Sequence, residues 1–204
     1  MGLNIENERK VKVAIIGPHG KILTGRRSQE EHTRKGEYDW FGGSFNPRES
    51  NLMRVARREV TIEEIPGIEL AHPRALHVKA VVVDGGFKTS YLIAAAAKNL
   101  PEEALMLEAQ NPPDDQEPDN FPGIVIPPGI ISMGDEHDLI GWVAPVNYNK
   151  NFLIPKKYRM AANIGRKGPI FRELVQLYQT DGSLLSLPQA MPTAQLAAPQ
   201  PEVI

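Results

Sequence analysis

The chain of 204 residues contains no cysteine, which excludes disulfide bonds, zinc-thiolate sites and a cysteine nucleophile. It also lacks an apolar run of ~18 residues, so we expect no transmembrane helix. The opening residues MGLNIENERK lack the apolar stretch of a secretory signal, and we therefore expect a cytoplasmic protein. Aromatic residues make up only 6%, but 41% hydrophobic and 24% charged residues are ordinary for a globular domain.

Positive charge is missing from the middle of the chain. Residues 99–149 carry ten acids and no Lys or Arg, and seven of the 18 prolines lie between Pro101 and Pro128. The net charge of -2 argues against general nucleic-acid binding. We expect a single domain over residues 1–182 with an acidic, Pro-rich, irregular insertion at 99–135, which contains one helical turn at 102–109. A flexible Pro/Gln/Ala-rich tail is expected at 183–204.

Turn residues and apolar patterns predict the regular elements. Two strand pairs flank Gly/Pro- or Asp/Gly-containing turns, namely 10–16 with 21–24 and 76–83 with 89–97. The segment 50–65 contains no Gly or Pro and stops at Pro66-Gly67, which predicts a central helix. A later strand is expected at 139–146 and an amphipathic helix at 168–179. Strands before and after a central helix indicate an α/β fold.

Two carboxylates of the central helix form the main candidate site. Glu59 and Glu63 are four residues apart, so an α-helix places them on one face, where like charges destabilise by ~0.2–0.5 kcal/mol. A shared cation would reverse that effect, and carboxylate oxygens suit Mg²⁺ or Mn²⁺. The preceding Gly42-Gly43 allows a backbone to approach a ligand closely. The simpler alternative is a solvated acidic face, with Glu49 complementing the helix dipole.

The string GGSFNPRESNLMRVARREVTIEE resembles the Nudix box, whose pattern is G-x5-E-x7-R-E-U-x-E-E-x-G-U. The hairpin VAIIGPHGKILTGRRS and the later stretch EHDLIGWV also resemble Nudix segments, so the likeness covers about residues 10–150. It implies a Nudix-like α/β/α sandwich with a mixed β-sheet and a central loop-helix-loop. It further implies Mg²⁺- or Mn²⁺-dependent hydrolysis of a pyrophosphate bond in a nucleoside diphosphate linked to another group. A homodimer stays open.

The resemblance also implies roles for single residues. Glu59 and Glu63 would bind the metal, supported by Glu49 and by the backbone of Gly43, while Arg58 would pair with Glu49 and orient Glu59. Glu136 is the first candidate for the general base, ahead of Asp138, Glu108 and Glu103. Arg26 and Arg27 would contact substrate phosphates, with surface charge as their alternative. Trp40 is a candidate substrate contact for which core packing is the stronger alternative.

The box departs from the family pattern in two places. Eight residues separate Glu49 from Arg58, where the pattern has seven, and one of its glutamates falls on Ile62 and its closing glycine on Ile65. These departures support a second hypothesis, a weakened Nudix-fold protein that binds a nucleotide-like ligand or a protein partner without turnover. A third hypothesis is an unrelated α/β binding protein whose match to the box is due to chance.

Overall fold

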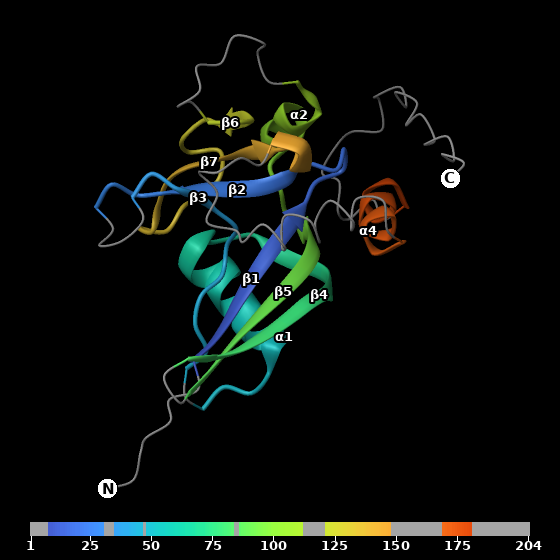
Figure 1. Ribbon diagram of the computed structural model, residues 1–204. Helices are drawn as coiled ribbons and strands as arrows, with labels where there is room; N and C mark the ends of the chain where they lie inside the picture. The colour runs from blue at the N-terminus through green and yellow to red at the C-terminus, as the bar shows by residue number, and fades with distance from the viewer. Residues whose placement is uncertain are drawn as a thin grey trace, which may run out of the picture.

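A mixed sheet forms the centre of the computed structural model, which describes residues 8–30, 35–46, 48–83, 86–111, 121–147 and 169–180 (Figure 1). Its strand order is β4-β5-β1-β2-β7-β6, with the short β3 paired to β2. β1 and β5 run parallel, and the other pairs are antiparallel. The seven strands are β1 Glu8–Ile16, β2 Ile22–Arg27, β3 Tyr38–Asp39, β4 Glu69–Val83, β5 Gly86–Lys98, β6 Ile124–Ile126 and β7 His137–Val143. The predicted α/β class with a mixed sheet is confirmed.

Both predicted strand pairs are present, but β4 begins at Glu69 and is therefore longer than expected. Pro73 concealed this start, because proline cannot donate to a sheet ladder. The structure accommodates it on the edge strand, at a register shift between Ala71 and Arg74. The sequence also gave no sign of β3 and β6, which are only two and three residues long.

The predicted helix 50–65 is correct for only half of its length. The α-helix α1 spans Leu52–Arg57, and the Asn51 side chain caps it by accepting a hydrogen bond from the Arg54 amide at 3.0 Å. From Arg58 to Glu64 the chain continues as a π-helix, η1. There the Ile65 amide bonds back five residues to the carbonyl of Val60, at 2.7 Å. This wider turn changes which side chains share a face.

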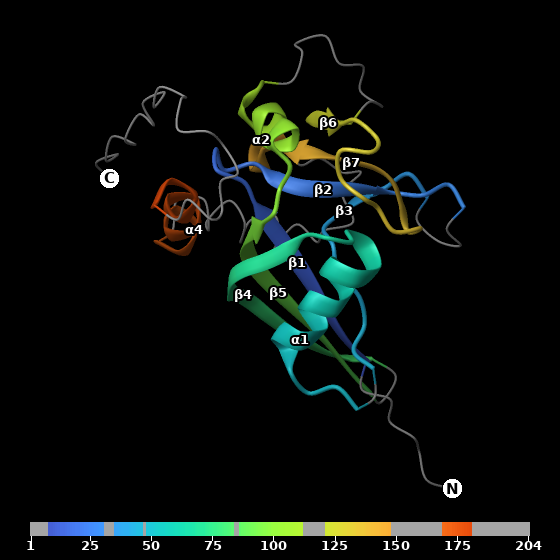
Figure 2. The ribbon, with the colours of Figure 1, turned by 180° about the vertical axis from the view of Figure 1, so that it is seen from behind.

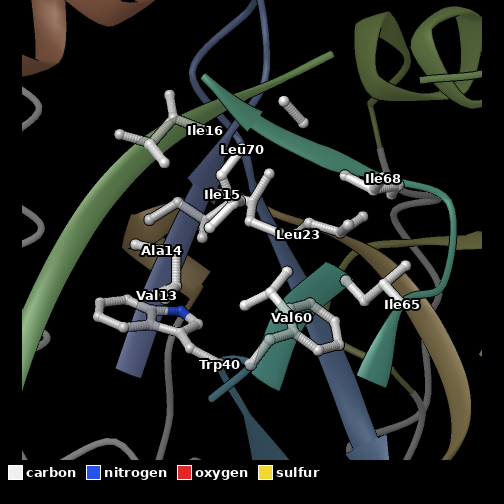
Figure 3. Close-up of a cluster of buried hydrophobic side chains, with 14 of the residues drawn as sticks. Val13, Ala14, Ile15, Ile16, Leu23, Trp40, Val60, Ile65, Ile68 and Leu70 are labelled. Atoms are coloured by element: carbon white, nitrogen blue, oxygen red, sulfur yellow. The ribbon is translucent and has the colours of Figure 1, made fainter. Parts of the chain in front are cut away.

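The core lies between this helical segment and the sheet. α1 and η1 cover the face around β1 and β4 (Figure 2). Val60 of η1 and the following Ile65 pack in one buried cluster with Val13 and Leu23 of the sheet and with Trp40 (Figure 3). The burial of these apolar side chains fixes η1, and with it the neighbouring acids, against the strands.

In the second half of the chain, the observed helices and strands differ in part from those expected. The predicted irregular insertion 99–135 contains a full α-helix, α2 Glu102–Ala109, and strand β6, while residues 112–120 lie outside the described part. β7 ends at Val143 because Pro145–Asn147 forms the 3-10 helix η2. The last helix, α4, spans Pro169–Thr180, close to prediction. The predicted tail lies outside the described residues.

One tyrosine ties α4 to the sheet. The Tyr178 hydroxyl donates to the carbonyl of Ile16 at 2.6 Å and accepts from the Ala97 amide at 2.8 Å, so it joins the ends of β1 and β5. Within the part of the chain that the structure describes, no helix is long and apolar enough to cross a membrane.

Candidate functional site

A glycine loop beside β1 forms one wall of the site. The Val13 amide donates to the carbonyl of Phe41 at 2.8 Å, and the Val11 amide donates to that of Gly43 at 2.9 Å. Gly42 has a φ of 126°, and a Cβ at this position would collide with the carbonyl of Val11. Only glycine fits here, because other residues avoid this φ and lack the space.

The π-helix directs two glutamates onto this loop. The carboxylate of Glu59 lies against Gly43, where a Cβ would collide with it. The carboxylate of Glu64 accepts a hydrogen bond from the Gly42 amide. Both residues are buried, at 6% and 2% exposure. They are five residues apart, the step of the hydrogen bonds in η1, and it is Glu59 and Glu64 that share the inward face, in place of the predicted Glu59 and Glu63.

Burial makes both carboxylates reluctant to ionise. It raises the pKa of Glu64 well above its ordinary value, although the ammonium of Lys12 and the Gly42 amide oppose the change. Burial also raises the pKa of Glu59, against the lowering effect of the Arg58 guanidinium. The charge of Glu136 raises the pKa of both residues. A bound cation would relieve this penalty, since opposite charge stabilises the ionised form.

Arg58 is the centre of an ion-pair network on the solvent side. Its guanidinium donates to both carboxylate oxygens of Glu49, at 3.2 and 3.0 Å, and lies 2.7 Å from Glu59 and 2.5 Å from Glu63. It also donates to the carbonyl of Ser44 at 2.9 Å. The hydrogen bonds from Arg58 lower the pKa of the Glu49 carboxyl. The predicted pairing of Arg58 with Glu49 is therefore present, and the same guanidinium holds Glu63, half of whose side chain is exposed.

The loop before β7 brings Glu136 to the same place. The Gly134 amide donates to the carbonyl of Glu64 at 2.8 Å, and the Ser28 amide donates to that of Glu136 at 2.9 Å. The Glu136 side chain is half exposed and lies 3.6 Å from the Arg27 guanidinium. The hydrogen bond between Gly134 and Glu64 therefore places this predicted acid near the helix acids, and its charge raises the pKa of both Glu59 and Glu64.

The weaker base candidates lie elsewhere. Asp138 pairs with the guanidinium of Arg26 at 2.7 Å. Glu108 is fully buried beneath the β1–β2 turn, where it accepts from the amides of His19 and Lys21, both at 3.0 Å. Glu103 lies exposed on α2.

The remaining candidates, one tryptophan and two arginines, differ in whether a ligand could contact them. Trp40 has no exposed surface, so its ring belongs to the core and is not available for stacking. Arg26 and Arg27 end strand β2, and each pairs with an acid of the segment that enters β7.

Sequence reasoning missed Glu64, Lys12 and Asp39. The Lys12 ammonium donates to Asp39 at 2.6 Å and to the carbonyl of Trp40 at 2.9 Å. Burial opposes its charge, but Asp39 and Glu64 outweigh burial and raise the pKa of Lys12. Glu64 could have been found by allowing one extra residue between Val60 and the Glu-Glu pair. In that alignment with the box pattern, Ile62 is the inserted residue, and its side chain is 67% exposed.

The carboxylates are not gathered into a ready metal cage. Among the described residues, no group of three or more Asp, Glu or His side chains is placed to hold a metal ion. Glu63 instead contacts Arg58. Metal binding would therefore require at least this side chain to change its partner.

Comparison with known proteins identifies the fold. No protein-family model and no curated protein matches the chain. Among solved structures, the MutT protein from Methanosarcina mazei Go1 is 20% identical, with 80% of this chain and 95% of that chain covered and a TM-score of 0.50. The MutT NUDIX hydrolase from Burkholderia pseudomallei is 18% identical over 78% of this chain and 97% of its own, with a TM-score of 0.49. The Methanosarcina structure confirms the Nudix-like fold that the sequence resemblance implied.

Proposed function

We propose that the protein is a Nudix-type hydrolase that cleaves a pyrophosphate bond in a nucleoside diphosphate linked to another group, with Mg²⁺ or Mn²⁺. The observation that carries this proposal is the convergence of Glu59 and Glu64 on Gly42-Gly43, with Glu136 close to both. The donor set fits these cations, because hard divalent ions prefer carboxylate and carbonyl oxygens. The raised pKa values of the two buried acids also support a cation site, because a bound cation would stabilise their ionised forms.

The acids of η1 would hold the metal. Glu59 and Glu64 face the loop already, and Glu63 joins them when it leaves Arg58. Glu49 is the supporting acid, and the carbonyl of Gly43 supplies a further oxygen through its second lone pair, since the first accepts from Val11. When bound, the metal supplies charge neutralisation on the phosphate oxygens.

The other residues position substrate and water. The carboxylate of Glu136 is the proposed general base, which accepts a proton from the attacking water. Arg58 keeps the Glu59 carboxylate against Gly43 through its 2.7 Å contact. Arg26 and Arg27 lie at the end of β2, beside the loop that carries Glu136. They are the proposed phosphate contacts, because guanidinium groups match phosphate oxygens geometrically.

A second candidate function is ligand binding without turnover, and the ion-pair network favours it. Arg58 contacts Glu49, Glu59 and Glu63, so three of the proposed acids already have a cationic partner. A chain in which this network persists would bind a nucleotide-like ligand or a protein partner on the same face without assembling a metal centre.

Hydrolysis assays separate the two functions. The full chain is incubated with Mg²⁺ and a panel of nucleoside diphosphates linked to sugars, nucleosides or phosphate, and cleavage is followed by mass spectrometry. We expect turnover that falls about 100-fold or more in Glu59→Gln, as for removal of a group that stabilises transition-state charge. Glu69→Gln, an exposed acid on β4, is the matched control and should retain full activity.

Turnover that Glu59→Gln leaves unchanged contradicts the metal assignment. Absence of turnover across the panel, with a nucleotide still raising the melting temperature, identifies the binding function instead.

A further inference from the structure

His137 is a buried imidazole without hydrogen bonds. It is the first residue of β7 and 5% exposed, and neither ring nitrogen has a hydrogen-bond partner among the described residues. Buried polar atoms in folded proteins are nearly always paired, so an unpaired imidazole in this position requires an explanation. None of the proposed roles above uses it.

Packing, and not hydrogen bonding, sets the orientation of this ring. It stands over Gly25 of β2, where a Cβ would collide with the imidazole carbon Cδ2. On another side it meets the ring of Phe41 edge-on, with centroids 5.2 Å apart. A glycine in the interior of a strand weakens that strand, so its presence here marks a close approach that the fold maintains. Both ring nitrogens are thereby left unbonded.

The charges that act on the ring are the cations Lys12 and Arg27, which pair with Asp39 and Glu136. Burial, together with the neighbouring charges of Lys12 and Arg27, lowers the pKa of His137 to about 3. The imidazole is therefore neutral and carries one N–H donor and one acceptor. Both cations retain some contact with solvent, at 27% and 15% side-chain exposure, although the ring itself is covered. Glu136, the proposed base, immediately precedes it.

A neutral N–H donor near two cations suits an anionic oxygen. We propose that His137 is a substrate-binding residue whose ring N–H donates a hydrogen bond to a phosphate oxygen of the diphosphate, with Lys12 and Arg27 supplying the compensating positive charge. The inference rests on the proposed function and extends it, because it assigns recognition of the diphosphate group to β7. The imidazole then obtains its missing partner only when the site is loaded, and the ligand gains a hydrogen bond that the free protein does not use.

Binding of inorganic pyrophosphate tests this role directly. Calorimetry with Mg²⁺ compares the full wild-type chain with His137→Phe, His137→Met and His137→Gln. We expect about tenfold or more weaker pyrophosphate binding in the Phe and Met variants, the usual size of a lost hydrogen bond to a charged group. Gln keeps a donor and should retain part of the affinity. Met guards against overpacking by the larger Phe ring, since it adapts to irregular spaces.

Thermal stability distinguishes this role from a structural one. Because His137→Met removes two unpaired polar atoms, we expect the metal-free variant to melt at or above the wild-type temperature while its pyrophosphate affinity falls. In kinetics on any nucleotide that wild type cleaves, KM should rise more than kcat falls. His72→Phe removes an exposed imidazole on β4 and should leave the pyrophosphate affinity and KM unchanged.

The possible results distinguish failure of this inference from failure of the proposed function. Unchanged pyrophosphate affinity in both the Phe and Met variants overturns the inference, and so does a wild type that binds no pyrophosphate. A wild type that binds pyrophosphate through His137 but cleaves nothing on the nucleotide panel supports the inference and rejects hydrolysis.

Discussion

The ionisation of the buried Glu64 carboxyl opposes folding. Burial raises its folded pKa above the unfolded value, so the folded state binds the extra proton. The resulting stabilisation is fully present below the unfolded pKa of about 4.5 and is lost as pH rises through the folded pKa. The free energy of unfolding of the metal-free protein should therefore fall as pH increases across that window.

Glu64→Gln should remove this pH dependence. Glutamine cannot ionise but keeps an oxygen for the Gly42 amide, so we expect the metal-free variant to be more stable than wild type at pH 8, by about 1 kcal/mol. Urea unfolding between pH 4 and 8 measures the difference. Glu63→Gln, half exposed and paired with Arg58, should keep the wild-type slope. A Glu64→Gln variant that retains the full slope contradicts the assignment.

At the same scale, the sequence identified residues whose partners lie close in the chain but missed residues whose partners are distant in the sequence. Glu59 and the Arg58–Glu49 pair could be named because the box fixes their local spacing, and Glu136 because it begins the later stretch EHDLIGWV that also resembles a Nudix segment. Lys12 and Asp39 could not, since their 2.6 Å contact joins β1 to β3 across 27 residues. His137 carried no signal, because only the cross-strand position of Gly25 shows that its ring is buried without partners.

Among the elements, η1 decides which acids face the loop. An α-helical reading pairs Glu59 with Glu63 and leaves Ile62 in a ligand position. The π-helix holds one residue more in its turn, which moves Ile62 to solvent and turns Glu64 inward. The apolar periodicity of the sequence cannot predict such a π-turn, because one extra residue disturbs the spacing of the apolar side chains only slightly. The strand pairs, in contrast, were predictable because their turn residues are local signals.

Deleting Ile62 tests whether it is an insertion. The deletion restores α-helical spacing, with the Glu-Glu pair three and four residues after Glu59. We expect the variant to fold with an unchanged circular dichroism spectrum and to keep the stabilisation by Mg²⁺. Ile62→Ala, which retains the π-helix and removes only an exposed side chain, should behave as wild type. If the deletion abolishes the Mg²⁺ effect while Ile62→Ala preserves it, the π-turn itself is required for the site.

For the whole molecule, the structure shows where several acids of the segment without Lys or Arg, residues 99–149, are placed. Residues 99–149 contain ten acids and no Lys or Arg, and this block places Glu136 near the helix acids while Asp138 pairs with Arg26. It also supplies the buried Glu108 that holds the β1–β2 turn. The described part of the block therefore contributes β6 and β7 to the sheet and Glu136 to the candidate site, and Glu136 and Asp138 pair with Arg27 and Arg26 from the first half of the chain.

Metal binding should consequently stabilise the entire fold. Because Glu59 and Glu64 are buried against the loop that pairs with β1, a cation that favours their ionised forms adds to the free energy of unfolding. We expect the melting temperature to rise with Mg²⁺ or Mn²⁺, corresponding to ~2.7 kcal/mol at a concentration 100 times Kd. The rise should be greater at pH 8 than at pH 5, where protonation of the two acids competes with the metal. Differential scanning fluorimetry with matched ionic strength measures it, and Na⁺ is the control for screening. A melting temperature indifferent to millimolar Mg²⁺ and Mn²⁺ at pH 8 contradicts an intact metal site, and the Arg58 network then makes binding without turnover the better function.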